Sequence, residues 1–190
     1  KTTDAGASWT TVVTDSANSF YAIHFPTASI GYGVGYNGYI RKTSDGGATW
    51  TTQNAGGTYL LKSVYFANAN TGWAVGWSGT FLKTTDGGTT WNLQNTGFSY
   101  FLNSVFMTGI NNGYAAGDKL MATNNGGTSW PVQFAGYTNF LNSIFIIPSE
   151  TTGYAVGDGG LVVKSTSVVT DLINFDENLK HAKTGYDSEN

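Results

Sequence analysis

The chain of 190 residues contains no cysteine, three prolines, a single arginine and only 11% charged residues. Without cysteine, the sequence excludes disulfides, thiol nucleophiles and zinc sites built on cysteine ligands. Residues 1–166 carry seven basic and seven acidic side chains, with Arg41 as the one arginine, so we expect no nucleic-acid partner. No apolar run approaches the roughly 20 residues that cross a bilayer, which predicts no membrane span.

Glycine and aromatic residues are abundant instead. The 26 glycines follow no Gly-X-Y period, so the chain is neither collagen-like nor typical of a linker. With 40% hydrophobic residues it can build a core. The net charge of −3 comes from residues 167–190, which hold two lysines and five acidic residues. The absence of an initiator methionine and of a signal-like segment predicts a fragment or a processed form.

Three sequence patterns recur together along the chain. The first reads TTDAGASW, TSDGGATW, TTDGGTTW and TNNGGTSW, with its last residue at Trp9, Trp50, Trp91 and Trp130. The second reads GYGVG, GWAVG, GYAAG and GYAVG. The third begins FYAIHF, LKSVYF, LNSVFM and LNSIFI. Because all three recur every 39 to 41 residues, they indicate a repeat array.

The signals inside one unit, residues 51–91, are all those of β-strands. Residues 60–66 form an apolar run, and residues 72–76 form a short strand bounded by glycine. Ser78-Gly79 and Asp86-Gly87-Gly88 are turn signals, and Asn37-Gly38 occupies the first of these places in the preceding unit. Four short strands in a unit of this length are typical of a propeller blade. We therefore predict an all-β fold, a β-propeller of about four four-stranded blades.

The segment S/T-x-D-x-G-x-T/S-W resembles the Asp-box, and residues 1–166 resemble the Asp-box (BNR-repeat) β-propeller family. Within this family the chain looks like the photosystem II assembly-factor group, whose units read much like GYAVG…ILKTTDGGTTW. Sialidases, some glycanases and sortilin-type receptors share the motif, so it specifies architecture rather than function. The resemblance implies an exported protein, extracellular or periplasmic.

The Asp-box residues are interpreted as structural. Their aspartates should accept backbone N–H bonds within their own turn, as Asn125 can through its amide oxygen, and their tryptophans should bury large rings. These residues are Asp4, Trp9, Asp45, Trp50, Asp86, Trp91, Asn125 and Trp130. Regular repetition beside a turn is a sufficient explanation for the carboxylates, so we expect no metal site, and no cofactor is implied.

Closure of the ring is open to several arrangements. The full units span 10–50, 51–91, 92–130 and 131–166, with a stub at 1–9, and the fourth unit lacks the motif. The stub carries what the fourth unit lacks, which would complete the last blade and close a four-bladed ring. Consecutive blades of a larger propeller, or two copies joined as a homo-oligomer, would explain the same pattern. The acidic tail 167–190 reads as a helix over 171–183 or as a linker.

Propellers usually bind partners at the channel mouth, where turns between the second and third strands meet the loops between blades. The residues before these turns are Tyr36, Trp77, Asp118 and Asp158, which vary in type and are the candidate ligand-binding residues. Two aromatic rings and two carboxylates suit a protein or glycan partner, although ordinary turn-flanking residues would read the same way. The loops expected beside them are 54–58, 95–100 and 134–139.

The predicted function is a non-enzymatic binding or assembly module. A glycan-processing enzyme is the alternative, with Asp118 and Asp158 as the carboxylate pair that glycoside hydrolysis uses. Sialidase chemistry is disfavoured, because that family clamps its substrate with three arginines. A structural, self-associating surface repeat is the third possibility. His24 occupies the position in its repeat that Tyr65, Phe106 and Phe145 occupy in the others. We therefore interpret it as a packed ring and expect no histidine-based site.

Overall fold

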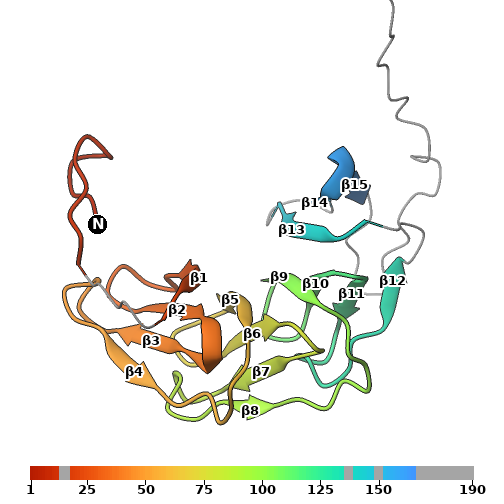
Figure 1. Cartoon of the computed structure of the whole chain (residues 1–190), viewed down its shortest axis with the longest axis horizontal. Helices are drawn as coiled ribbons and strands as arrows, with labels where there is room; N and C mark the ends of the chain where they lie inside the picture. Colours follow the sequence, from red (N-terminus) through yellow and green to blue (C-terminus); the bar gives the residue numbers. More distant parts are fainter. Residues whose placement is uncertain (13–17, 135–138, 148–151, 166–190) are drawn as a thin grey trace, which may run out of the picture.

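A computed structural model of the chain describes residues 1–12, 18–134, 139–147 and 152–165. Its strands form four separate antiparallel sheets that follow one another along an open crescent (Figure 1). The predicted tail helix, and most of the predicted loop 134–139, lie outside the described residues. In every sheet the strands are paired in chain order, which is the blade topology of a β-propeller and confirms the predicted fold class.

The first two blades have four strands each. Blade 1 comprises β1 (Phe20–His24), β2 (Gly31–Gly35), β3 (Ile40–Thr43) and β4 (Thr51–Gln53), with the short 3-10 turn η1 (Tyr36–Gly38) between β2 and β3. Blade 2 comprises β5 (Leu61–Phe66), β6 (Gly72–Gly76), β7 (Phe81–Thr84) and β8 (Asn92–Leu93).

The last two blades differ in strand number. Blade 3 comprises β9 (Leu102–Met107), β10 (Gly113–Gly117), β11 (Leu120–Thr123) and β12 (Val132–Phe134). Blade 4 comprises β13 (Leu141–Ile146), β14 (Gly153–Gly157) and β15 (Val162–Ser165), with the 3-10 turn η2 (Asp158–Gly160) between β14 and β15. Among the described residues β15 therefore has no outer partner strand.

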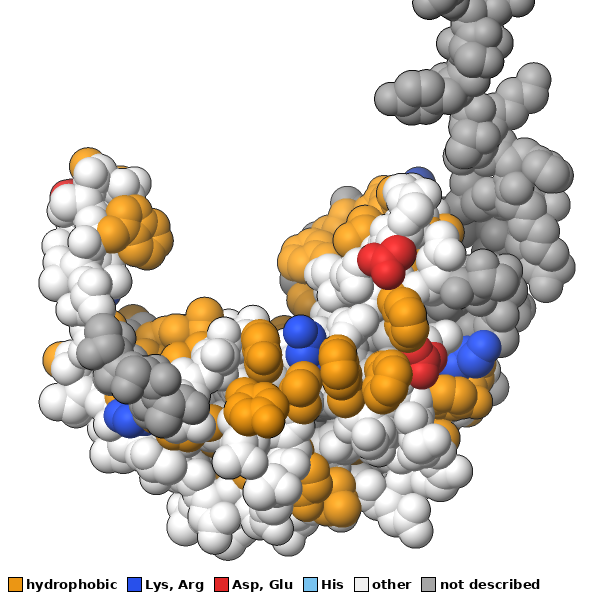
Figure 2. Space-filling model, in the orientation of Figure 1, with side chains coloured by type: hydrophobic (Ala, Val, Ile, Leu, Met, Phe, Trp, Pro, Cys, Tyr) orange, Lys and Arg blue, Asp and Glu red, His pale blue; other side chains and the backbone are white. Residues whose placement is uncertain are grey.

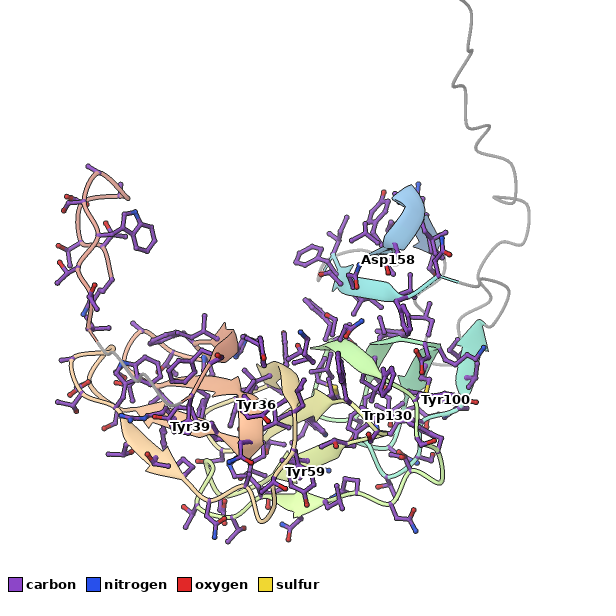
Figure 3. All side chains as sticks on the ribbon, viewed as in Figure 1. Tyr36, Tyr39, Tyr59, Tyr100, Trp130 and Asp158 are labelled. Carbon is purple, nitrogen blue, oxygen red and sulfur yellow. The ribbon has the colours of Figure 1, made fainter. Side chains whose placement is uncertain are left out.

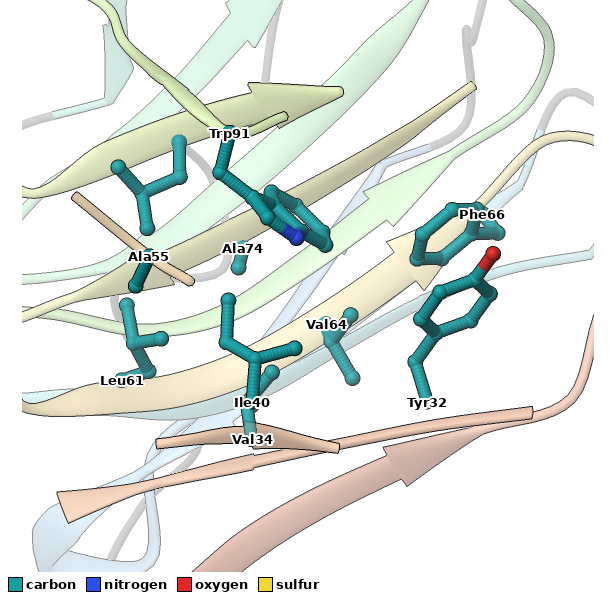
Figure 4. Packing of buried hydrophobic residues seen from close by; sticks show 10 residues of the cluster. Tyr32, Val34, Ile40, Ala55, Leu61, Val64, Phe66, Ala74 and Trp91 are labelled. Atoms are coloured by element: carbon teal, nitrogen blue, oxygen red, sulfur yellow. The ribbon is translucent and has the colours of Figure 1, made fainter. Parts of the chain in front are cut away.

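The hydrophobic core lies between blades. Each pair of neighbouring blades encloses one buried cluster, and the three clusters share no residue. Between blades 1 and 2, Tyr32 stacks on Phe66 with ring centroids 3.7 Å apart, and Phe66 meets Trp91 edge to face at 5.8 Å (Figure 4). The second strand of each blade is bounded by glycine at both ends, and β6 is buried along its whole length.

The two ends of the crescent are open. The N-terminal segment 1–12 lies at the blade 1 end, whereas β13–β15 form the opposite end (Figure 1). A ring closed within one chain would need the N-terminal segment beside β15, and in this structure the two are apart. Closure by the chain's own stub thus remains a prediction for solution measurements.

Candidate functional site

Each Asp-box is an internally saturated turn. In the box of blade 1, Asp45 Oδ1 accepts hydrogen bonds from the backbone N–H groups of Ala48 and Thr49 at 2.9 and 2.8 Å, and Oδ2 accepts the Thr49 hydroxyl at 2.6 Å. The Thr43 hydroxyl donates to Asp45 Oδ1 and accepts the N–H of Gly47. In blade 3, Asn125 Oδ1 accepts the Ser129 N–H at 3.0 Å, so the amide replaces the carboxylate with little change.

The box carboxylates are held ionised by these donors. Hydrogen bonds from the Thr90 hydroxyl, the Thr90 N–H and the Thr84 hydroxyl lower the pKa of Asp86 to about 2. Hydroxyl and backbone donors lower the pKa of Asp4 and Asp45 well below the ordinary range in the same way. Because their lone pairs are engaged inside the turn, these carboxylates are poorly placed to bind a ligand.

The expected burial of Trp9 is wrong. Its ring is 75% exposed, whereas Trp91 and Trp130 are buried. The box around it is intact, since Asp4 accepts the Ser8 N–H and the Thr2 hydroxyl. The ring is exposed because segment 1–12 carries a box but belongs to none of the four sheets.

The boxes also fasten neighbouring blades together. The carbonyl oxygen of Gly87, in the box of blade 2, accepts hydrogen bonds from Lys42 Nζ at 2.7 Å and from the Tyr32 hydroxyl at 2.9 Å, both in blade 1. The carbonyl oxygen of Gly126 in blade 3 accepts hydrogen bonds from the corresponding residues of blade 2, Lys83 Nζ at 2.7 Å and Trp73 Nε1 at 3.1 Å. The boxes therefore fix the angle between blades, which places the inner ends of the blades relative to one another.

The candidate ligand-binding residues follow a close backbone approach at the end of the second strand of each blade. A Cβ added to Gly76 would lie 1.9 Å from the carbonyl oxygen of Leu60, so only glycine fits. The next residue, Trp77, donates its N–H to the same carbonyl at 3.1 Å. The other three blades repeat this geometry at Gly35, Gly117 and Gly157. The glycine thereby fixes the backbone from which each candidate side chain projects.

The loops between blades meet these turns, as expected. Gly79 donates its N–H to the carbonyl oxygen of Tyr100 at 2.7 Å, and Gly38 donates to that of Tyr59. Tyr59 directly follows the predicted segment 54–58, and Tyr100 is the last residue of the predicted segment 95–100; both are labelled in Figure 3. The turns and the inter-blade loops thus form one continuous rim.

The four candidate residues do not form a single cluster. Trp77 and Asp158 line one hollow of about 330 Å³. Tyr36 and Asp118 lie outside this lining, and Tyr36 is 52% exposed on η1. Asp118 Oδ2 accepts the N–H of Phe101 at 2.9 Å, so this carboxylate holds the backbone beside Trp77 rather than facing the hollow. Asp158 Oδ1 accepts Asn142 Nδ2 at 2.6 Å.

Sequence reasoning missed most of the residues that line this hollow. Its remaining lining residues are Lys62, Phe101, Asn103, Phe140 and Asn142. Trp77, Phe101 and Phe140 form a row of rings with centroids 5.0 and 6.4 Å apart. Figure 2 shows hydrophobic side chains gathered in a band across one face of the molecule. Each of these three side chains is partly or largely exposed, and Trp77 is 42% exposed.

A polar column runs beside this aromatic row. It consists of the second residue of the first strand in each blade, namely Tyr21, Lys62, Asn103 and Asn142. Lys62 Nζ lies 4.3 Å from the centroid of the Tyr21 ring, and Asn103 Nδ2 donates to the Leu141 carbonyl at 3.0 Å. The residue type at this position varies from blade to blade. The same variation identified Tyr36 and Trp77 as candidate binding residues, so it could have identified these four residues as well.

The hollow therefore combines a flat aromatic wall with one cation, one carboxylate and two amides. Aromatic rings with adaptable polar groups beside them are the usual composition of a site for peptides or sugars. No group of three His, Cys, Asp or Glu side chains suited to a metal occurs in the part of the chain that the structure describes. Among these residues there is also no helix with the length and apolarity that crossing a bilayer requires.

His24 packs as a ring. It lies 4.5 Å from Tyr65, centroid to centroid, and its Nδ1 accepts the N–H of Phe66 at 3.3 Å. Burial lowers the pKa of the imidazole, which keeps it neutral and suits this packing.

Comparison with known families decides the relationship. Residues 1–95 and 58–135 match the family described as photosynthesis system II assembly factor YCF48. The chain belongs to this family. A search of curated proteins finds no match.

Solved structures share the fold of this family member. YCF48 bound to D1 peptide aligns with a TM-score of 0.65 and 23% identity, covering 77% of this chain and 49% of that one. The chain thus spans about half the length of that relative. The GH74 enzyme of Niastella koreensis aligns with a TM-score of 0.65 and 17% identity, covering 77% of this chain and 28% of that one. The computationally designed Ika4 protein aligns with a TM-score of 0.65 and 10% identity, covering 84% of this chain and 99% of that one.

Proposed function

We propose that this protein is a non-enzymatic binding module that holds an extended segment of a partner protein against the rim hollow. The observation that carries the proposal is the exposed aromatic row of Trp77, Phe101 and Phe140 beside Lys62 and Asp158. Large exposed rings in a row are unusual on a soluble surface and are typical of binding sites. Membership of a family of assembly factors, and the D1 peptide bound by YCF48, support a peptide as the ligand.

The chemistry of the hollow indicates how such a segment would bind. Apolar side chains of the segment would pack on the three rings, while its backbone amides would meet the side chains of Asn103 and Asn142. Lys62 and Asp158 present opposite charges to the same hollow, so a segment carrying one acidic and one basic residue would be oriented by them.

Titration of the D1 peptide by isothermal calorimetry tests the proposal, with a scrambled peptide as the reference. We expect Trp77→Ala to weaken binding about 30-fold, since a central aromatic anchor typically contributes 2 kcal/mol or more. Leu93→Ala is the control, because Leu93 is also an exposed apolar residue, at 56% against 42% for Trp77, but lies on the outer strand β8 and outside the lining of the hollow. No binding by the wild-type protein, or equal affinities for the two variants, would contradict the proposal.

Glycan processing is the competing function, and we propose binding without catalysis. Both carboxylates of the predicted pair already accept hydrogen bonds, Asp118 from the Phe101 N–H and Asp158 from Asn142. A catalytic acid needs a proton on an oxygen that faces the substrate. Release of reducing ends from a polysaccharide panel, lost in both Asp118→Asn and Asp158→Asn, would overturn this part of the proposal. The extracellular or periplasmic location remains a prediction, and fractionation of the source cells would test it.

A further inference from the structure

A second hollow lies on blade 2. It measures about 600 Å³ and is lined by Tyr59 from the loop before the blade, by the turn 78–80, and by residues 93–99 at the end of β8 and in the loop that follows. We call it the loop hollow, and it shares no lining residue with the rim hollow. Blade 2 packs on a neighbouring blade at each side, so the loop hollow lies away from both open ends of the crescent (Figure 1).

The turn and the loop that form this hollow are fixed against each other. A Cβ added to Gly79 would lie 2.1 Å from the carbonyl oxygen of Phe98, so the turn is in direct contact with the loop. Gln94 donates its N–H to the carbonyl oxygen of Phe81 at 2.8 Å, which ties the start of the loop to β7. A hollow held in this way needs little ordering when a ligand binds, and its volume is within the roughly 300–1,000 Å³ usual for small-ligand sites.

Two aromatic rings line the loop hollow, and each is supported by its own loop. The ring of Phe98 stacks on Tyr100 with centroids 5.1 Å apart and an interplanar angle of 26°. The ring of Tyr59, labelled in Figure 3, covers Gly57, where an added Cβ would lie 2.7 Å from it. Rings held in place offer apolar contact area at a small cost in conformational entropy.

The polar groups of the loop hollow are uncharged, and several are free. None of the described residues in its lining is acidic or basic. Five of its polar groups have no hydrogen-bond partner in the described part of the protein, in contrast to the saturated Asp-boxes. They are the hydroxyls of Tyr59, Ser78, Thr96 and Ser99 and the Nδ2 group of Asn95. Hydroxyls both donate and accept, so this set suits a ligand that is itself rich in hydroxyl groups.

The backbone of Ser78 supports a role for its hydroxyl in binding. Ser78 has a φ of 58°, in the left-handed region that serine disfavours. The equivalent residues Asn37 and Gly159 also have positive φ, but they are of types that accept this conformation. Strained residues of this kind gather at functional sites. The turn itself would be satisfied by glycine, which indicates that the Ser78 side chain serves a ligand.

We propose that the loop hollow binds a neutral oligosaccharide, at a site separate from that of the proposed function. The C–H faces of the sugar rings pack on Tyr59 and Phe98, and the sugar hydroxyls bond Ser78, Ser99 and Asn95. An ionised ligand would lose hydration without meeting an opposite charge in this lining. A peptide segment fits less well, because its backbone brings one donor and one acceptor per residue, whereas each sugar ring brings several hydroxyls to the free groups gathered here.

Titration with defined sugars, followed by saturation-transfer nuclear magnetic resonance, is the first test. The probes are maltotriose, cellotriose and laminaritriose, with trigalacturonic acid as their charged counterpart. We expect at least one neutral trisaccharide to bind with a dissociation constant of about 1 mM or tighter. Absence of binding by all three would overturn the proposal. Equal or stronger binding of the acidic trisaccharide would also overturn it, because an uncharged lining offers a carboxylate no partner.

Two variants test the site itself. Tyr59→Ala removes a ring and should weaken sugar binding roughly 10-fold or more. Ser78→Gly removes one hydroxyl and relieves the strained φ, so binding should weaken about 3- to 10-fold while the urea midpoint stays the same or rises. Ile110→Ala, at an exposed residue in neither lining, is the control and should bind the sugar like the wild type. Wild-type affinity in Ser78→Gly or in Tyr59→Ala would contradict the proposal.

Two further results would assign the ligand differently. Loss of sugar binding in Trp77→Ala, with binding kept in Tyr59→Ala, would place the sugar in the rim hollow. Displacement of the sugar by the D1 peptide, in wild-type protein and in Trp77→Ala alike, would show that the loop hollow takes a peptide. Either result overturns this proposal, whereas peptide binding that depends on Trp77 and leaves the sugar in place is the result expected of two separate sites.

Discussion

Replacing Trp130 by alanine should be among the most damaging single changes in the interface between blades 2 and 3. Trp130 is 5% exposed, its ring stacks on Phe81 at a centroid distance of 4.2 Å, and its Nε1 donates to the Gly127 carbonyl oxygen at 3.1 Å. Removing a buried tryptophan side chain typically costs about 3–5 kcal/mol of unfolding free energy. The ring pair accounts for about 0.5–1.5 kcal/mol and the hydrogen bond for about 1 kcal/mol of this.

Urea unfolding followed by far-ultraviolet circular dichroism, at one protein concentration, measures the effect. With a slope of about 2 kcal/mol per molar urea, the midpoint for Trp130→Ala should fall by about 1.5–2.5 M. Trp130→Phe keeps a ring against Phe81 but loses the hydrogen bond and part of the contact, so it should lose about 1–2 kcal/mol. Leu93→Ala is the control, since Leu93 is 56% exposed and its truncation should change stability by less than about 0.5 kcal/mol. A loss below about 1 kcal/mol for Trp130→Ala would refute the assignment of stability to the inter-blade contacts.

Two further predictions follow from the turns. Gly76→Ala should prevent the close approach of the backbone to the Leu60 carbonyl and destabilise the fold by about 3 kcal/mol or more. An unchanged urea midpoint would contradict this prediction. The depressed pKa of Asp86, about 2 against an ordinary 3.8, means that its stabilising contribution is complete above pH 4 and is lost as the pH falls toward 2. Asp86→Asn should therefore show a shallower loss of the urea midpoint between pH 4 and pH 2 than the wild type, and equal slopes would contradict this.

Much of the fold was predictable because each pattern has a local physical cause. The Asp-box is saturated within seven residues, as Asp45 shows, so its geometry does not depend on the rest of the chain. The glycine-bounded second strand also has a local cause, the close approach at Gly76. Repetition of such local devices at one period is a reliable sign of blades.

The environment of Trp9 was not predictable from the motif. A motif specifies a turn, but the burial of its tryptophan depends on a blade that covers it, and among the described residues segment 1–12 joins none of the four sheets. The same limit applies to the closure of the ring, which depends on contacts between distant parts of the chain or between copies.

The candidate site was predicted only in part. Trp77 and Asp158 line the same hollow, but Asp118 accepts a hydrogen bond from the Phe101 backbone. The equivalent positions of these residues in the repeats do not predict this difference. Lys62 was passed over because residues 60–66 read as a strand without a polar face, whereas the second position of that strand lines the hollow. Side-chain direction at a strand end depends on the blade as a whole, and sequence spacing gives it only approximately.

Hydrogen–deuterium exchange of the protein with and without the D1 peptide tests the central claim, that the rim hollow is the binding surface. The account predicts slower exchange in the presence of the peptide in the segments that carry the lining residues of the hollow, 61–63, 76–78, 100–104, 139–143 and 157–159. It predicts unchanged exchange in the Asp-box of blade 2, residues 84–91. Protection confined to the Asp-boxes and outer strands, or no protection anywhere, would contradict the account.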